Sequence, residues 1–460
     1  MRIFEVVAGV LLVLSTWISV LATLVVPRGL RSRHATVVRI IVRWPFQFIA
    51  DHCRSYETKD RVLAWSAPLS ILATLLSWLV LFVAGFGLLV AGFGDLPVTQ
   101  GFKEAGSSVF TLGVVWSAGG RLTLLDFSAA ATGPVIVGLL VGYLPALYGA
   151  YARRETEVTL LVARGGSPAW GPEILSRHWQ IAGLIDTVPE LFRNWERWSA
   201  EVAESHTSYP VLLDFRSPRA GRNWLVALLA IMDAAALELA LNPSRPDGQI
   251  RLAIRSGFTC VREIASSERI PYDEDPDPDS DIGLTYAEFS QGIDLLRYSN
   301  YPMERTAQEA WPHFRGWRVN YESTVYELAY RIDAVPAPWS GPRRRPGQRM
   351  TVRSPQDRQP TVPKVQAQAP TAADPAATLM AAEAAAEAAK SAKAVKAGVS
   401  GAATQPAKPV LSEQECLPVP IHRSDTGLIV SDFGGLYPAP YGAKGSGAGN
   451  GGNGSSGTPA

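Results

Sequence analysis

Three long stretches without a charged side chain constrain this chain more than any other feature of its sequence. They run from Val6 to Val26, from Ser66 to Gly94 and from Phe127 to Tyr151, and none contains Asp, Glu, Lys or Arg. A helix needs about 20 apolar residues to cross the ~30 Å hydrocarbon core of a bilayer, because each residue advances it by about 1.5 Å. The sequence therefore predicts three membrane-spanning helices.

A fourth apolar stretch, Asn223 to Leu241, predicts a different kind of helix. Asp233 and Glu238 lie within it, and a carboxylate at the middle of a membrane costs roughly 2.5 to 3.5 kcal/mol. We therefore expect a buried helix of a water-soluble domain. Residues 155–335 predict an all-α cytosolic domain with Trp195 and Trp198 in its core. Its clearest expected helices are Val188 to Ser205, Ile250 to Ser267, Tyr286 to Tyr298 and Met303 to Ile332.

The segment between the first two spans is rich in basic residues and sets the expected orientation. Its basic side chains outnumber Asp51, Glu57 and Asp60, and loops of this kind stay in the cytoplasm. The N-terminus is then outside and the C-terminus inside a cytoplasmic membrane. A cleavable signal peptide fits less well because Arg2 is the only basic residue before the first span. A voltage sensor fits less well because the arginines lie outside an apolar span. The basic residues between the first two spans are Arg28, Arg31, Arg33, Arg39, Arg43, Arg54, Lys59 and Arg61.

A short apolar run, Ser107 to Trp116, lies between the second and third spans. It is too short to cross a membrane. A short helix followed by a glycine-containing loop, between two spans, is typical of a hairpin that re-enters the membrane. The carbonyl end of such a half-helix carries partial negative charge, which favours a cation. An extracellular loop between two ordinary spans is the alternative.

The segment from Ser66 to Arg154, which contains this short run and its two flanking spans, resembles the two-transmembrane pore domain of the potassium channel family, in its bacterial and two-pore-domain-like forms. In that family, a pore helix with small hydroxyl residues leads into a T-x-G-Y/F-G filter whose carbonyl oxygens replace the hydration shell of potassium. The resemblance implies a pore helix that includes Ser107 and Ser108. It implies an ion pathway lined by Thr111, Leu112, Gly113, Val114 and Val115.

The filter of this chain departs from the family pattern at Val115, which occupies the place of the second glycine. A β-branched residue reaches the backbone angles of that glycine only with strain, so we expect weak potassium selectivity. The resemblance implies that Gly138 and Gly142 form an inner-helix hinge, with helix packing alone as the alternative. It also places Asp126 near the outer mouth, where a carboxylate concentrates cations. Because each chain supplies one hairpin and a pore needs four, we expect a homotetramer.

The remaining motifs predict neither an enzyme nor a metal or cofactor site. Cys53, Cys260 and Cys416 are far apart, and no CxxC, HExxH, GxxxxGK[ST] or GxSxG pattern occurs. A net charge of +1 gives no indication of nucleic-acid binding. One acidic stretch has spacings like those of an EF-hand, but Ile282 stands where a calcium loop needs glycine. A solvated loop is therefore expected at Asp277, Asp279, Asp281, Gly283, Thr285 and Glu288.

The full expectation is an all-α membrane protein with three transmembrane helices, a re-entrant pore hairpin, an α-helical cytosolic domain and a disordered tail. Residues 1–65 hold the first span and a basic cytosolic loop, 66–154 the pore-like domain, 155–335 the helical domain, and 336–460 a Pro/Ala/Gly-rich tail. Its partners would be a monovalent cation, with potassium favoured, and membrane lipid. The leading hypothesis is a cation channel. The alternative is a non-conducting membrane anchor or scaffold that recruits cytosolic partners.

Overall fold

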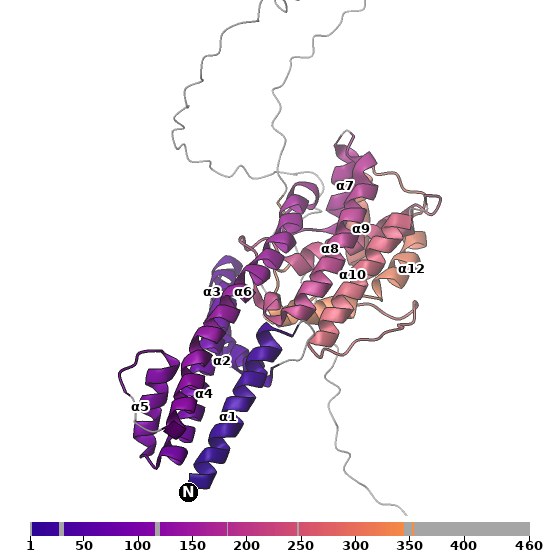
Figure 1. Cartoon of the computed structure of the whole chain (residues 1–460). Coiled ribbons are helices and arrows are strands. Elements are labelled where there is room, and N and C mark those ends of the chain that lie inside the picture. Colours follow the sequence, from indigo (N-terminus) through magenta and orange to yellow (C-terminus); the bar gives the residue numbers. More distant parts are fainter. Residues whose placement is uncertain are drawn as a thin grey trace, which may run out of the picture. The chain divides into compact units, whose positions relative to one another are not determined.

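The structure is a computed structural model that describes residues 2–26, 32–115, 120–181, 183–245, 248–344 and 352–353. Within these ranges the regular structure is helical (Figure 1), apart from one isolated bridge between Ser167 and Arg353. The all-α prediction is confirmed for this part of the chain. Most of the expected tail, with Cys416, lies outside the described residues.

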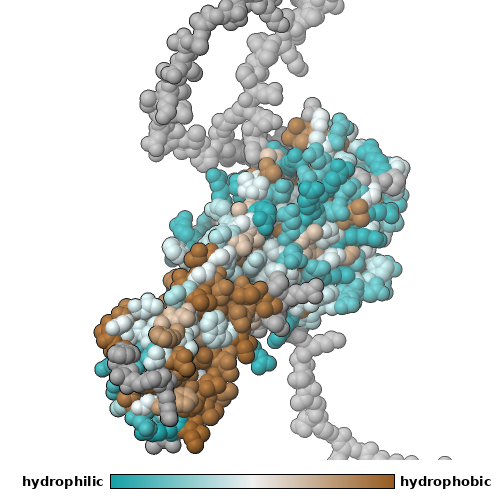
Figure 2. All heavy atoms as spheres, viewed as in Figure 1, coloured by the Kyte–Doolittle hydropathy of each residue, from teal (hydrophilic) through white to brown (hydrophobic). Residues whose placement is uncertain are grey.

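Three helices are long and apolar enough to cross a membrane while leaving much of their surface exposed. They are α1 (Arg2–Leu24), α4 (Ser66–Gly94) and α6 (Gly120–Gly165). Apolar side chains cover much of the surface over α1, whereas hydrophilic side chains predominate over the residues that follow α6 (Figure 2). This distribution is compatible with a multi-pass membrane protein, because only lipid makes large exposed apolar surfaces favourable.

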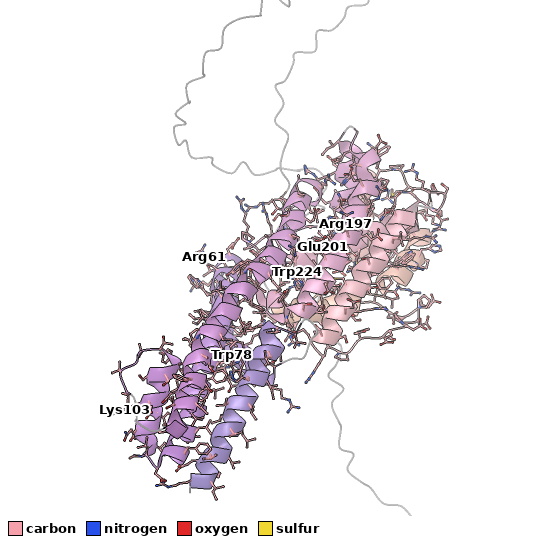
Figure 3. All side chains as sticks on the ribbon, in the orientation of Figure 1. Arg61, Trp78, Lys103, Arg197, Glu201 and Trp224 are labelled. Carbon is pink, nitrogen blue, oxygen red and sulfur yellow. The ribbon has the colours of Figure 1, made fainter. Side chains whose placement is uncertain are left out.

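Helices α1 and α4 pack closely because glycines line their contact. A Cβ atom on Gly9 would lie only 2.8 Å from the carbonyl oxygen of Gly85. Further along the same contact, Trp78 lies between the two helices (Figure 3) and donates a 2.9 Å hydrogen bond from Nε1 to Ser19 Oγ. Small residues thus allow close approach, and the indole N–H has a partner away from water.

The basic segment after α1 is largely helical rather than an open loop. Helix α2 (Arg33–Asp51) and helix α3 (Tyr56–Ala64) form a hairpin that leads into α4. Ser32 and Ser55 act as N-caps, since their hydroxyls accept hydrogen bonds from the first-turn N–H groups of α2 and α3. The expected basic connection between the first two spans therefore contains two helices, which its charge pattern alone did not indicate.

The helical domain comprises α7 to α13, and α9 (Trp224–Leu241) lies at its centre. Of the 18-residue apolar window in α9, 94% is buried inside the protein. Asp233 pairs with Arg318 at 2.7 Å and accepts a hydrogen bond from Tyr321, while Glu238 accepts one from Tyr301. The predicted burial of this helix is confirmed, and each of its carboxylates has an internal partner.

The helices around α9 test the remaining expectations. Three expected helices are confirmed, as is the burial of Trp195 and Trp198. The expectation of one helix over Met303 to Ile332 was wrong, because Asn320 donates to the last carbonyls of one helix and ends it before the next begins. The helices are α7 (Gly171–Gln180), α8 (Val188–Ser208), α10 (Gly248–Ser267), α11 (Tyr286–Tyr298), α12 (Ala307–Arg318) and α13 (Glu322–Ile332), with the short turns η1 (Ile185–Thr187) and η2 (Pro210–Asp214).

Helix α6 continues without interruption from its apolar half into the helical domain. It is 46 residues long, so the expected span from Phe127 to Tyr151 is only its middle. Just beyond that span, the buried side chain of Arg154 donates to the carbonyl oxygens of Leu212 at 2.9 Å and Phe215 at 2.8 Å. These bonds fasten α6 to the segment around η2.

Candidate functional site: the hairpin between α4 and α6

The segment that follows α4 turns sharply and runs back along it. Only Asp95, Leu96 and Pro97 separate Gly94, the last residue of α4, from α5 (Val98–Val109). Asp95 takes the left-handed conformation with φ of 57°, which ends α4, and Pro97 cannot extend it. The half-helix expected over Ser107 to Trp116 thus exists, but it begins and ends earlier than the apolar run suggested.

Contacts along α4 and α6 measure how far α5 runs back. On α4, Gly101 lies against Gly87, so closely that a Cβ on Gly101 would overlap the Gly87 carbonyl oxygen, and Gly106 lies beside Val83. Val83 is eleven residues before Gly94, which corresponds to about 17 Å along the helix axis. The end of α5 therefore lies well inside the length of α4.

Contacts with α6 give the same value for the distance over which α5 runs back. Leu122, near the beginning of α6, contacts Gly94, whereas Gly133, eleven residues further on, contacts Val109 at the end of α5. This separation is again about 17 Å. Gly133 has no side chain in the way, and a Cβ there would overlap the carbonyl oxygen of Val109. The hairpin thus runs down between α4 and α6 and returns to the start of α6.

The residues expected to line an ion pathway lie together on the loop at the end of α5. Thr111 and Gly113 both have positive φ, at 55° and 64°, so the chain reverses here through the left-handed region. Leu112 and Val114 project outward and are 64% and 78% exposed. The loop therefore presents an apolar surface at the end of the hairpin, and residues 116–119, which follow, lie outside the described residues.

Ser107 holds this loop to the end of α5. Its Oγ accepts hydrogen bonds from the N–H groups of Val114 at 2.9 Å and Val115 at 3.1 Å. In a trans peptide, the carbonyl of the preceding residue points opposite to the N–H. The carbonyl oxygens of Gly113 and Val114 consequently point away from Ser107, toward the outside of the hairpin. The structure thus brings Ser107 together with Leu112, Val114 and Val115, since the N–H group of Leu112 also donates to the carbonyl oxygen of Ser107.

Asp126 is buried against α5 in the single chain. The residue is only 9% exposed, and its Oδ1 accepts a 3.1 Å hydrogen bond from Ser108 on α5. The fully buried carboxyl group of Glu104, also on α5, interacts with it. Asp126 faces α5 because α6 already begins at Gly120, which places Asp126 in its second turn. Glu104 follows Lys103 directly in the sequence, so its charge pattern looks like that of a solvated pair and does not indicate a buried partner for Asp126.

Gly138 and Gly142 are exposed on α6, and a Cβ on either would meet nothing within 4 Å. The close helix approach expected from their spacing is thus absent within the described part of one chain. Val135, Val141 and Tyr148 share this side of α6 and are 46–65% exposed. An apolar surface on a helix that lies against no other helix of its own chain is available to lipid or to another copy.

The described part of the chain offers no cluster of side chains that could form a metal site. No group of three or more His, Cys, Asp or Glu side chains there could hold a metal ion. In the EF-hand-like stretch, Glu288 instead accepts hydrogen bonds from the N–H and hydroxyl of Thr285, and Arg315 pairs with Asp279 at 2.9 Å. These carboxylates are thus engaged in a helix cap and an ion pair.

Comparison of the chain with known families and proteins yielded no relative. No family model matches it, and searches of curated proteins and of solved structures returned no match.

Proposed function

We propose that this chain is one subunit of a homotetrameric, cation-conducting membrane protein in which α5 and its loop re-enter the bilayer. In this proposal α1, α4 and the first part of α6 span a cytoplasmic membrane, with the N-terminus outside and the helical domain in the cytosol. The observation that carries it is the fold of the hairpin, whose tip lies about 17 Å along both α4 and α6. An ordinary surface loop would remain at the helix ends.

Electrostatics supports a cation rather than an anion at the tip. The carbonyl end of a helix carries partial negative charge, equivalent to roughly half an elementary charge, and this end of α5 lies at the tip. The outward carbonyl oxygens of Gly113 and Val114 add two further ligands per chain. Four hairpins around one axis would bring eight such oxygens together, which is how a filter replaces the hydration shell of a cation.

Exposed apolar surface supports assembly into a tetramer. Leu112 and Val114 at the tip, and Val141 on α6, are each more than 60% exposed in the single chain. Around a four-fold axis the tip residues would meet their symmetry copies, and the open side of α6 at Gly138 and Gly142 would face the axis or a neighbour. Gly138 and Gly142 then provide the room in which the inner helix bends.

Weak discrimination between potassium and sodium follows from the same loop. Val115 replaces a glycine of the family pattern, and its β-branched side chain restricts the backbone angles that aim carbonyl oxygens at an ion. Fewer well-oriented oxygens compensate less of the dehydration of potassium, so selectivity should be low.

The alternative is a non-conducting membrane anchor that recruits cytosolic partners. The observation that favours it is the apolar tip. Four copies each of Leu112 and Val114 would form a hydrophobic constriction, and such constrictions exclude water and ions. The two functions predict the same assembly and differ in whether current flows.

Single-channel recording of purified protein in planar bilayers separates these functions. We expect currents whose reversal potential under potassium and sodium gradients lies near that of a non-selective pore. The paired change Val114→Tyr with Val115→Gly should shift the reversal potential toward potassium. Strong potassium selectivity in the unmodified protein would contradict the filter argument.

Two serine variants provide matched controls for the loop. Ser107→Ala removes the acceptor for the N–H groups of Val114 and Val115 and should change conductance or selectivity. Ser108→Ala lies one residue away and loses only its bond to Asp126, so the permeability ratio should stay unchanged. Native mass spectrometry in the same preparation reports the oligomeric state. A tetramer that passes no current would support the anchor instead.

A further inference from the structure

Helix α2 exposes a continuous apolar stripe. Six of its large apolar side chains are 52–71% exposed, namely Val37, Ile40, Ile41, Trp44, Phe48 and Ile49. Their spacings of three, four and seven residues place them on one side of the helix. Such a stripe costs free energy in water, since each exposed side chain of this size would gain by burial.

The opposite side of α2 is polar and is fastened to the helical domain. Arg39 donates to the carbonyl oxygen of Pro210 at 3.2 Å and pairs with Glu268 at 3.1 Å. One turn later, Arg43 pairs with Asp214 and also donates to the carbonyl oxygen of Arg331. The helical domain therefore covers the polar side of α2, and the apolar side faces away from it.

The start of α2 lies beside the apolar length of α4. Ser32 shares a 2.6 Å hydrogen bond with Ser19 on α1, and His34 shares a 2.7 Å hydrogen bond with Ser77 on α4. Ser77 lies seventeen residues before Gly94, or about 25 Å along α4. A bilayer is about 30 Å thick in its hydrocarbon core and about 40–45 Å thick with its headgroups, so α2 begins inside the cytosolic leaflet.

Two exposed tryptophans, Trp44 on α2 and Trp65 between α3 and α4, lie at matching depths. Helix α2 runs antiparallel to α3 and α4, because four residues join it to α3 and α3 leads into α4. Trp44 lies ten residues after His34 and Trp65 twelve residues before Ser77, so both are about 15–18 Å beyond the contact between His34 and Ser77. They are 71% and 62% exposed. Exposed tryptophans at one level are typical of a membrane–water interface.

We propose that the part of the apolar stripe that precedes Trp44, namely Val37, Ile40 and Ile41, inserts into the cytosolic leaflet of the bilayer, so that lipid is its partner. The proposal rests on the spanning topology proposed above but not on conduction. Continuity with the exposed side of α1 and α4 favours lipid over a second copy of the chain. Charge agrees, because Arg54 between α2 and α3 and Arg61 on α3 (Figure 3) are exposed on the cytosolic side of the two tryptophans, where anionic headgroups attract such residues.

The proposal gives α2 two partners at once, lipid on one side and the helical domain on the other. Movement of the helical domain would then displace α2 within the leaflet. A change in the leaflet would likewise act on the helical domain through Arg39 and Arg43.

Spin labels on the full chain in nanodiscs with one-third anionic lipid test the stripe. In a background with its three native cysteines replaced, one label is placed at a time on Val37→Cys and Ile41→Cys. Leu11→Cys on α1 is the lipid reference, and Leu252→Cys on α10 is the water reference, since both native side chains are at least 50% exposed. Power saturation with oxygen, which partitions into lipid, and with a water-soluble nickel chelate gives the environment of each label.

The expected result is that labels at positions 37 and 41 resemble position 11, with relaxation by oxygen exceeding relaxation by nickel. Stronger relaxation by nickel, as at position 252, would overturn the proposal by placing the stripe in water. Protection from both reagents, with broadening between labels of different copies, would overturn it in favour of a subunit interface. A nickel-accessible label at position 11 would instead disprove the spanning topology itself, so the two failures are distinguishable.

Discussion

The close contact between α5 and α4 allows a quantitative test of the hairpin. Gly101 on α5 lies so near the backbone of Gly87 that an added Cβ would overlap its carbonyl oxygen and lie 3.0 Å from Ala91 Cβ. Neither neighbour can rotate away, since one is backbone and the other has a single methyl group. Gly101→Ala should therefore destabilise the packed hairpin by about 1–3 kcal/mol, the usual cost of overpacking.

A matched control lies five residues further along the same helix. At Gly106 the nearest atom to an added Cβ is a methyl group of Val83 at 3.9 Å, an ordinary contact. Gly106→Ala therefore adds the same methyl group without a clash. Both changes gain about 1 kcal/mol of helix propensity, so the difference between the two variants isolates the clash.

Cysteine labelling measures this difference. With the native cysteines replaced, Val109→Cys serves as a reporter, because Val109 is 2% exposed in the packed hairpin and reacts only when α5 separates from its neighbours. Since 1.4 kcal/mol changes an equilibrium constant tenfold, Gly101→Ala should label about 5 to 150 times faster than Gly106→Ala. Equal labelling rates would refute the close packing of α5 on α4 and, with it, the depth of the hairpin.

Three further predictions concern the helical domain. Arg318→Met should lower its stability by about 3–5 kcal/mol in thermal unfolding followed by tryptophan fluorescence, because Asp233 would lose a buried partner; a loss below about 1 kcal/mol would contradict the importance of this pair. Burial, with Arg154 close by, holds the pKa of His206 well below 6.5, and burial also lowers the pKa of His178. The unfolded chain therefore binds these protons at a higher pH than the folded chain, so stability should fall as the pH drops below 6.5, by up to about 1.4 kcal/mol per pH unit from His206, and the pH dependence should weaken in His206→Gln. Calorimetry should find no calcium binding tighter than a Kd of about 10⁻⁴ M, because Glu288 is engaged in a helix cap; a micromolar site lost in Glu288→Ala would disprove this.

Periodicity and charge in the sequence were sufficient for the large elements. Apolar length alone marked α1, α4 and α6, and the two acidic residues in α9 distinguished a buried soluble helix from a fourth span. The bounds of α11 matched because Thr285 and Glu288 form a capping box that is visible as a short motif. Where a local signal reports a local interaction, sequence reasoning succeeded.

It failed where an interaction joins residues far apart in the chain. The basic residues of α2 look like a topology signal, yet the partners of Arg39 and Arg43 lie more than 170 residues away at Asp214 and Glu268. Asp126 looks exposed in the sequence because it stands at the edge of an apolar run, but α5 turns it inward. Such pairings depend on how helices pack, and hydropathy carries no information about that.

The continuity of α6 has a mechanical consequence. A helix of 46 residues is a rod of about 69 Å, with one arm beside the hairpin tip and the other fastened through Arg154 to the helical domain. A tilt of about 5° around its midpoint would displace each end by about 3 Å, the scale on which a pore opens or closes. Pro134 and Pro145 interrupt the backbone hydrogen bonds of α6, so bending of the helix concentrates at these two positions. Such bending would reduce the part of a displacement at the helical domain that is transmitted to the hairpin.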